Sequence, residues 1–281
     1  MDKIISLQNL SFIEKVVNKL SSKLKIKDPK EILWLVYGSY VINMNNEKSD
    51  LDIIGIHNSF TKKKRTVLDY KNVPIHLSTI TMQDLKEDGE SRLYGSYFTG
   101  KIINPHIFLY GNTKLKNEAI YHAGKFIGPL VGYLGYLTSE KSYLPSQITS
   151  LVFIAYFSIG PSFDQVFLGY YISPEFNKIW ECLCQQTILM LKTAKVIKPI
   201  NNKYIFTQRF TNYKKFHFER MKIAARHWSY GVFCHEGDYK FPDWLFSKAE
   251  EKMKKADPTG KKYKEMIVFL KRQSGLSSIY I

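Results

Sequence analysis

The chain has 281 residues, 44% of them apolar, and a formal net charge of +16. This length and apolar content are enough for two domains of ordinary size, each with its own core. The three cysteines are too few and too oddly spaced for a disulfide framework. The longest apolar runs, at residues 126–137 and 151–160, are shorter than the roughly 18 residues that a membrane span requires. We therefore expect no disulfide-stapled module and no membrane partner.

The amino terminus shows neither the apolar core of a signal peptide nor a transit-peptide pattern, so a cytoplasmic location is expected. Only six of the 41 basic residues are arginine, and arginine is the better bidentate ligand for phosphate. The positive charge is unevenly distributed: residues 1–112 hold 16 basic and 12 acidic groups, and residues 113–281 hold 25 and 13. The excess charge thus lies mainly in the carboxyl-terminal part.

Helices and strands alternate along residues 1–112. Helical spacing of apolar residues predicts a helix over 12–24, and short apolar runs predict strands. The predicted elements are a helix at 12–24, a strand at 32–37, a short helix at 40–43, a polar loop at 45–49, strands at 50–56 and 73–80, a helix from Thr81, and a strand at 107–111. The fold class that follows is α/β (α+β): a small mixed β-sheet flanked by helices.

After Gly111 the strand signals fade and helical spacing dominates. Helices are predicted at 114–137, 148–158, 176–196 and 216–233, with a turn at 201–203 and a break at 257–260 between two last helices. This pattern predicts an α-helical bundle domain over residues 113–281, following the α/β domain over residues 1–112.

One segment carries most of the chemical information. The strand that ends at Tyr37 is followed by Gly38-Ser39, then by ten residues, then by Asp50-Leu51-Asp52. Residues two apart on a strand point to the same face, so the two aspartates project together. Paired carboxylates bind hard divalent cations, while a glycine at a strand-to-helix junction lets phosphate oxygens approach backbone N–H groups. A phosphate cradle facing a metal-binding pair suits phosphoryl or nucleotidyl transfer.

On these residues the chain resembles the DNA polymerase β-like nucleotidyltransferase superfamily, and most of all its minor, antibiotic-modifying branch. The resemblance is close over about 25 residues, and the order of strands matches over about 110. It implies that Asp50 and Asp52 ligate two Mg²⁺ ions and that Gly38 and Ser39 bind the triphosphate of an NTP. One ion would activate an acceptor hydroxyl and the other would stabilise the departing pyrophosphate.

The sequence departs from that superfamily at the third acidic position. Such enzymes usually supply a third carboxylate from a following strand, where this chain has His76. A neutral imidazole is able to ligate a metal or to accept a proton, so we predict a catalytic role for His76 and keep an inert strand histidine as the alternative. Glu87 and Glu90, on the next predicted helix, are weaker candidates for the general base.

Other motifs have weaker support. Residues 95–101 fit most of a P-loop pattern, but Ile102 replaces the hydroxyl that would bind magnesium. Lys101 or Arg92 remains a candidate contact for the phosphates. Arg220 and His227 have the spacing of a helical ribonuclease pair, which also arises readily in any basic helix. The remaining unsupported candidates are Cys182 with Cys184, and Cys234 with His235, neither of which has partners at zinc-site spacing.

The predicted function is metal-dependent transfer of a nucleoside monophosphate from an NTP to a hydroxyl of a small-molecule acceptor, with release of pyrophosphate. Residues 1–112 are expected to form the nucleotidyltransferase catalytic domain, and the helical domain is expected to bind the acceptor. Two alternatives stay open. The basic carboxyl-terminal part favours a toxin-like enzyme that modifies tRNA or protein. The missing third acid favours a catalytically silent NTP-binding module.

Overall fold

A five-stranded mixed sheet organises the amino-terminal part of the protein. The structure, a computed structural model, describes residues 5–24, 28–60, 64–90, 97–138, 140–157, 163–208, 251 and 254–276. The strands are β1 (Leu33–Tyr37), β2 (Leu51–Ile56), β3 (Lys64–Tyr70), β4 (Val73–Ile80) and β5 (His106–Leu109). Their order across the sheet is β3-β4-β2-β1-β5. β2 and β4 run parallel, and the other neighbouring pairs are antiparallel.

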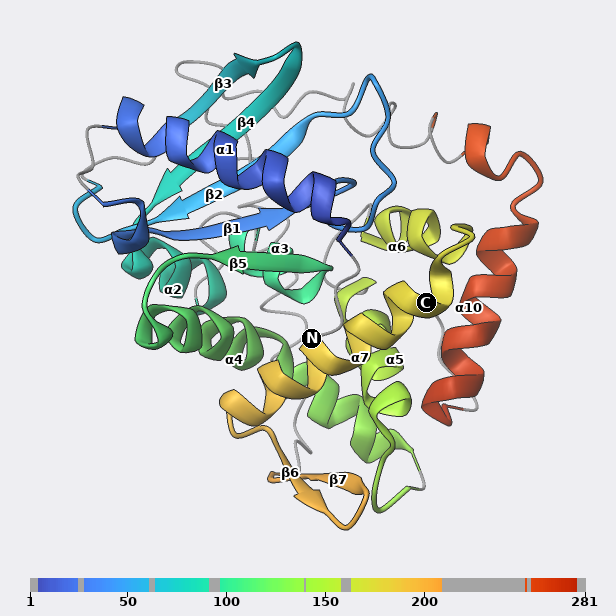
Figure 1. The fold of residues 1–281 in the computed structure, drawn as a ribbon. Coiled ribbons are helices and arrows are strands. Elements are labelled where there is room, and N and C mark those ends of the chain that lie inside the picture. The colour runs from blue at the N-terminus through green and yellow to red at the C-terminus, as the bar shows by residue number, and fades with distance from the viewer. Residues whose placement is uncertain are drawn as a thin grey trace.

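Helices cover both faces of this sheet (Figure 1). The central strand β1 is buried along its whole length, as is β2 except at Asp52, which explains why both strands have nearly continuous apolar sequences. Helix α1 (Leu7–Lys23) crosses one face and buries Ile13, Val16 and Val17. Helices α2 (Met82–Glu90) and α3 (Tyr97–Ile103) lie on the opposite side. The predicted α/β class, with a small mixed sheet flanked by helices, is confirmed.

The rest of the described chain is mainly helical. Its helices are α4 (Thr113–Leu137), α5 (Pro145–Phe157), α6 (Phe163–Tyr171), α7 (Phe176–Thr193) and α10 (Lys261–Ser274). Helix α4 packs against α2 and α3 beneath the sheet and also against α5 and α7, while α10 packs against α5. The long helix α4 thus joins the sheet layer to the helical region (Figure 1).

Several features differ from the sequence-based prediction. Residues 40–43 form turns rather than a short helix. Strand β3 was not predicted, because the basic run before it hides the alternation, and Val67 is exposed on this edge strand. After α7 the chain forms a hairpin of β6 (Ile197–Ile200) and β7 (Lys203–Phe206), where the sequence predicted only a turn. The short helices α3 and α6 were also not predicted.

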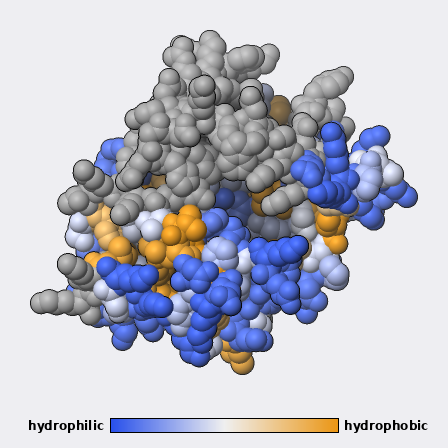
Figure 2. All heavy atoms as spheres, turned by 90° about the horizontal axis from the view of Figure 1, so that it is seen from above, coloured by the Kyte–Doolittle hydropathy of each residue, from blue (hydrophilic) through white to orange (hydrophobic). Residues whose placement is uncertain are grey.

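Some predicted features lie outside the described residues. They are the helix at 216–233, Arg92, Arg220, His227, Cys234 and His235. Within the described part of the chain, no helix combines the length and the hydropathy that crossing a bilayer would need. In the view from above, hydrophilic side chains cover much of the described surface and hydrophobic ones gather in smaller patches (Figure 2).

Candidate metal centre

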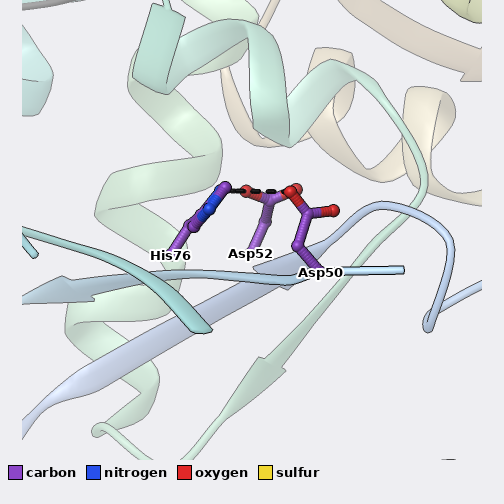
Figure 3. A group of neighbouring side chains, drawn as sticks. All are labelled: Asp50, Asp52 and His76. Atoms are coloured by element: carbon purple, nitrogen blue, oxygen red, sulfur yellow. Dashed lines mark ion pairs between the residues drawn. The ribbon is translucent and has the colours of Figure 1, made fainter. Parts of the chain in front are cut away.

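Two neighbouring central strands bring three ligand-type side chains together at one end of the sheet. Asp52 on β2 is the register partner of His76 on β4. Asp50 lies two residues before Asp52, directly ahead of the first residue of β2. Because the side chains of a strand repeat every two residues, all three project from the same face. Figure 3 shows the three side chains on one side of the sheet with their polar ends converging.

The distances within this group are short. His76 Nδ1 lies 3.1 Å from Asp50 Oδ2 and 3.6 Å from Asp52 Oδ1 (Figure 3). The three side chains each offer one ligand atom, and these atoms lie within 4.8 Å of one another. No second group of three such residues occurs in the part of the chain that the structure describes. The predicted pairing of Asp50 with Asp52 is therefore present in space, and His76 joins it.

The three side chains are half-buried. Their exposed fractions are 47% for Asp50, 24% for Asp52 and 26% for His76. A metal held here would keep one side open to solvent or substrate, as a catalytic rather than a closed structural site requires. Two carboxylates and one imidazole form a mixed oxygen and nitrogen donor set that suits a divalent cation. The group can therefore hold a metal ion.

The turn after β1 lies directly against the carboxylates. Tyr37, the last residue of β1, is the register partner of Asp52, and Gly38 follows with a positive φ of 88°. A Cβ on Gly38 would lie 3.4 Å from Asp52 Oδ2. The left-handed backbone favours glycine here, and an added Cβ would be in van der Waals contact with the carboxylate.

Ser39 follows this glycine inside a tight turn. Its carbonyl oxygen accepts a hydrogen bond of 2.9 Å from the N–H of Met44, and the carbonyl of Gly38 accepts one of 3.1 Å from Val41. No regular helix begins here. The prediction that a helix starts after Gly38 and offers its N-terminus to phosphate is therefore wrong. An anion bound at Gly38 and Ser39 would instead contact the backbone N–H groups of a turn.

The loop that leads into Asp50 is closed by its own hydrogen bonds. Ser49 Oγ accepts from the N–H of Asn46 at 2.9 Å, and Ser49 N–H donates to the carbonyl of Asn46 at 3.0 Å. Tyr40 is buried and stacks on Phe12 of α1 with ring centroids 5.7 Å apart. Burial raises the pKa of Tyr40, and the negative charge of Asp50 raises it further. Tyr40 thus links α1 to the surroundings of the metal ligands.

Lys101 lies on the same side of the sheet as the candidate metal group, which consists of Asp50, Asp52 and His76. Its Nζ lies 4.7 Å from the ring centroid of Tyr37 and 4.5 Å from that of Tyr97. The two tyrosine hydroxyls are 2.9 Å apart and share a hydrogen bond. Since Tyr37 is the register partner of Asp52, the two rings hold a cation near the carboxylates.

A buried carboxylate fixes the helix that carries Lys101. Asp88 Oδ2 accepts hydrogen bonds from the N–H groups of Phe98 and Thr99, both at 2.9 Å, and from Thr99 Oγ1 at 3.0 Å. Asp88 therefore caps the N-terminus of α3, where a negative charge also compensates the helix dipole. The sequence analysis missed this residue, along with Tyr37 and Tyr97, because one acidic position in an acidic helix carries no distinguishing signal.

The other candidates lie apart from the metal group. Glu87 accepts a hydrogen bond from Gln83 one turn earlier in α2, and Glu90 is near enough to His122 to influence its charge. Neither belongs to the group of three ligands. Residues 97–101 are helical rather than a phosphate-binding loop. On α7, burial raises the pKa of the Cys182 thiol to about 11, so Cys182 is not a reactive thiolate.

A hollow of about 390 Å³ lies on the α1 side of the same sheet end. Its aromatic lining comes from Phe12, Tyr40 and Tyr70, and Lys15 and Lys71 also contribute to it. Its size is within the range of small-molecule pockets. Tyr40 connects this hollow with the metal group, because the charge of Asp50 acts on its hydroxyl.

No family model matches the chain, and no curated protein matches its sequence.

Proposed function

We propose that this protein is a metal-dependent nucleotidyltransferase of the DNA polymerase β-like type, which transfers a nucleoside monophosphate from an NTP to a hydroxyl of a small-molecule acceptor. One observation carries the proposal: Asp50, Asp52 and His76 converge within 4.8 Å beside the Gly38-Ser39 turn. The Gly-Ser turn and the Asp-x-Asp pair are ten residues apart in sequence, but a Cβ added to Gly38 would lie only 3.4 Å from Asp52 Oδ2.

The donor set fits a divalent cation, with the carboxylates of Asp50 and Asp52 as oxygen ligands and His76 as a nitrogen ligand. When bound, Mg²⁺ or a similar ion would neutralise charge on the triphosphate and lower the pKa of the acceptor hydroxyl. His76 Nδ1 is the ring nitrogen that faces both carboxylates. This orientation favours a ligand role over that of general base, since one nitrogen cannot serve both roles at once.

The remaining groups bind and orient the substrates. In the reaction, the acceptor oxygen bonds to the α-phosphorus, the bond to pyrophosphate breaks, and the hydroxyl proton passes to a base. We assign the triphosphate to the Ser39 turn and to Lys101, whose ammonium is held between Tyr37 and Tyr97. Positioning and charge neutralisation supply most of the rate in this chemistry.

The small-molecule acceptor is proposed from the resemblance to the antibiotic-modifying branch. The hollow beside Tyr40 is not assigned to the acceptor, because Tyr70 and Val73 in its lining project from the face of the sheet opposite to His76 and Asp52. The alternative acceptors are tRNA and protein, for which the positive charge of residues 113–281 is the supporting observation.

The test is a transfer assay with each of the four α-labelled NTPs, Mg²⁺ or Mn²⁺, and a cell extract separated into small-molecule, RNA and protein fractions. We expect label in the small-molecule fraction and release of pyrophosphate. Asp52→Asn should abolish transfer while the fold is retained, and Glu47→Gln, an exposed carboxylate in the preceding loop, should transfer at the parental rate. Transfer by Asp52→Asn at the parental rate would contradict the proposal. Label in RNA or protein would change the acceptor class, and NTP binding without transfer to any fraction would indicate a silent module.

A further inference from the structure

The hollow on the α1 side of the sheet is separate from the metal centre. Its volume is about 390 Å³, and Tyr70 and Val73, which are register partners on β3 and β4, belong to its lining. Val73 lies three residues before His76 on β4, so these two side chains project from opposite faces of the sheet. A ligand in the hollow would therefore lie on the other side of the sheet from Asp52 and His76.

Three segments form the walls of the hollow, and contacts between their side chains hold them together. The ring of Phe12, on α1, has its centroid 5.7 Å from that of Tyr40 and 5.8 Å from that of Tyr70. Asn9 Nδ2 donates hydrogen bonds to the carbonyl of Tyr40 at 3.0 Å and to Asn45 Oδ1 at 2.8 Å. The loop after β1 and the β3–β4 turn are thus both fixed against α1, and the walls are preformed, as in most small-molecule sites.

Positive charge gathers at one end of the hollow, around Tyr70. The Nζ atoms of Lys19 and Lys71 lie 4.7 Å and 5.9 Å from the centroid of the Tyr70 ring. Lys15 lines the hollow one helical turn before Lys19, and like charges at this spacing repel each other. Among the residues that the structure describes, no acidic one lines the hollow and none forms an ion pair with these lysines. An anion bound at this end would relieve the repulsion.

The backbone of Lys71 supports a functional role for this charge. Lys71 and Asn72 form the two-residue turn between β3 and β4, and their φ angles are positive, at 53° and 64°. Such turns favour asparagine or glycine at both positions, because a longer side chain in the left-handed region costs free energy. A lysine in a conformation that disfavours it indicates a role for its side chain.

The other end of the hollow is neutral and polar. Gln8, Asn9 and Asn45 contribute amide groups to the lining, and Ser11 contributes a hydroxyl. Amides both donate and accept hydrogen bonds, as the hydroxyl groups of a sugar do. The helix rises about 10 Å from Gln8 to Lys15, so the hydrogen-bonding groups and the cations lie at two ends of one elongated hollow.

We propose that this hollow binds a sugar phosphate. The phosphate contacts Lys15 and Lys71, since lysine is a common ligand for phosphate. The sugar hydroxyls contact the amides of Gln8 and Asn45, and the C–H groups of the sugar pack on the ring of Phe12. The volume is sufficient for one monosaccharide phosphate. The proposal requires neither a metal nor nucleotidyl transfer, so it does not depend on the proposed function.

The test measures binding of three probes to the whole protein by calorimetry and ligand-observed NMR, without divalent metal and at constant ionic strength. The probes are glucose 6-phosphate, glucose and inorganic phosphate. We expect glucose 6-phosphate to bind with a dissociation constant of about 1 mM or lower, and the other two at least about tenfold more weakly. If glucose 6-phosphate does not bind below about 5 mM, or if inorganic phosphate binds equally well, the proposal is overturned.

Variants of the lining separate the contributions. Lys15→Gln and Lys71→Asn should each weaken binding of glucose 6-phosphate about fivefold. Gln8→Leu should weaken glucose 6-phosphate and leave inorganic phosphate unchanged, because only the sugar contacts this amide. Lys125→Gln removes an exposed lysine of α4 and is the matched control, which should bind like the parent. Equal affinity in both lining lysine variants and in Lys125→Gln would overturn the proposal.

Further variants locate the site. Ser11→Trp, at an exposed position of the lining, should fill the hollow and abolish binding of glucose 6-phosphate, and unchanged binding would overturn the proposal. Lys71→Asn should not lower the melting temperature, because asparagine suits the left-handed turn, so its weaker binding would not reflect unfolding. Asp52→Asn and Lys101→Met should bind glucose 6-phosphate with the parental affinity. Loss of binding in either of these two variants would assign the phosphate to the opposite face of the sheet and overturn the proposal.

Discussion

Gly38 faces Asp52 across the β1–β2 pair, and a Cβ atom added to Gly38 would lie 3.4 Å from Asp52 Oδ2. The left-handed turn after β1 is therefore a direct neighbour of one carboxylate of the candidate metal centre. This relationship joins the two halves of the sequence motif, which are separated by ten residues along the chain. It also offers a direct way to disturb the metal centre without removing a ligand.

The first prediction concerns Gly38→Ala. Alanine at a φ of 88° should lower the free energy of unfolding by about 1–2 kcal/mol. The turn should shift to relieve this backbone strain, and because it lies next to Asp52, the shift should weaken Mn²⁺ binding at least about tenfold. Denaturant unfolding and metal titration measure the two effects. Gly260→Ala is the matched control, because Gly260 also has a positive φ, of 66°, and no neighbouring atom within 4 Å of the added Cβ. Gly260→Ala should lower the free energy of unfolding and leave the affinity for Mn²⁺ unchanged. If Gly38→Ala and Gly260→Ala bind Mn²⁺ with equal affinity, the prediction is contradicted.

The second prediction concerns the choice of metal. An imidazole nitrogen suits Mn²⁺ better than Mg²⁺, which prefers oxygen ligands. We expect the Mn²⁺ concentration that gives half-maximal transfer to be at least about tenfold lower than the corresponding Mg²⁺ concentration. In His76→Asp all three ligand atoms would be oxygens, so the ratio between the two metal concentrations should become smaller. Metal titrations of the transfer rate measure both values. His57→Gln, outside the ligand group, should behave like the parent, and a parental metal preference in His76→Asp would exclude His76 as a ligand.

The third prediction concerns Lys101. Replacing it with methionine keeps an unbranched side chain against Tyr37 and Tyr97 and removes the positive charge. The KM for the NTP should rise about tenfold, the equivalent of about 1.4 kcal/mol, because a charge-assisted contact with the triphosphate is lost. Steady-state kinetics measure this change. Lys125→Met, on the exposed face of α4, is the control, and an unchanged KM in Lys101→Met would remove this lysine from the phosphate site.

The fourth prediction concerns pH and stability. Burial lowers the pKa of His106 from 6.5 to about 4, so between these values the unfolded chain binds a proton that the folded chain does not. Stability from this residue is therefore fully present above about pH 6.5 and is lost as the pH falls toward 4, by about 3 kcal/mol in all. Urea unfolding at pH 7 and pH 4.5 measures the loss. In His106→Asn the amide can still donate to the Asn104 carbonyl, and the free energy of unfolding should fall less between pH 7 and pH 4.5 than in the parent. If it falls equally in both, other titrating groups cause the pH dependence.

Much of the sheet was predictable because its central strands are buried on both faces. The strand at 32–37 and the one at 50–56 have largely apolar sequences that indicate this environment, and the structure has β1 and β2 there. Strand β3 was missed for the opposite reason: as an edge strand it leaves Val67 53% exposed, and a basic run precedes it. The hairpin of β6 and β7 was missed because each strand has only four residues. The division at residues 112 and 113 stays a prediction.

The candidate site was predictable where the chemistry is local. The Asp50 and Asp52 pair follows from the two-residue repeat of a strand, and the structure brings these residues together. The position of Lys101 depends on Asp88, on the docking of α3 and on two tyrosines from different elements. No sequence pattern encodes such contacts, because they arise only once the helix has packed on the sheet. His76 was identified by its place on the third strand, and its role stays a prediction.

The position of the ligands relative to the sheet has a mechanical consequence. Asp52 and His76 belong to strands that are hydrogen-bonded on both sides, so the distance between their backbones is set when the protein folds. Asp50 precedes Leu51, where the pairing of β2 with β4 begins, and is attached to a turn instead. Two candidate ligands, Asp52 and His76, are therefore held by the sheet, whereas Asp50 can adjust to a cation of different radius. Accommodating another ion requires movement of one short loop and leaves the sheet intact.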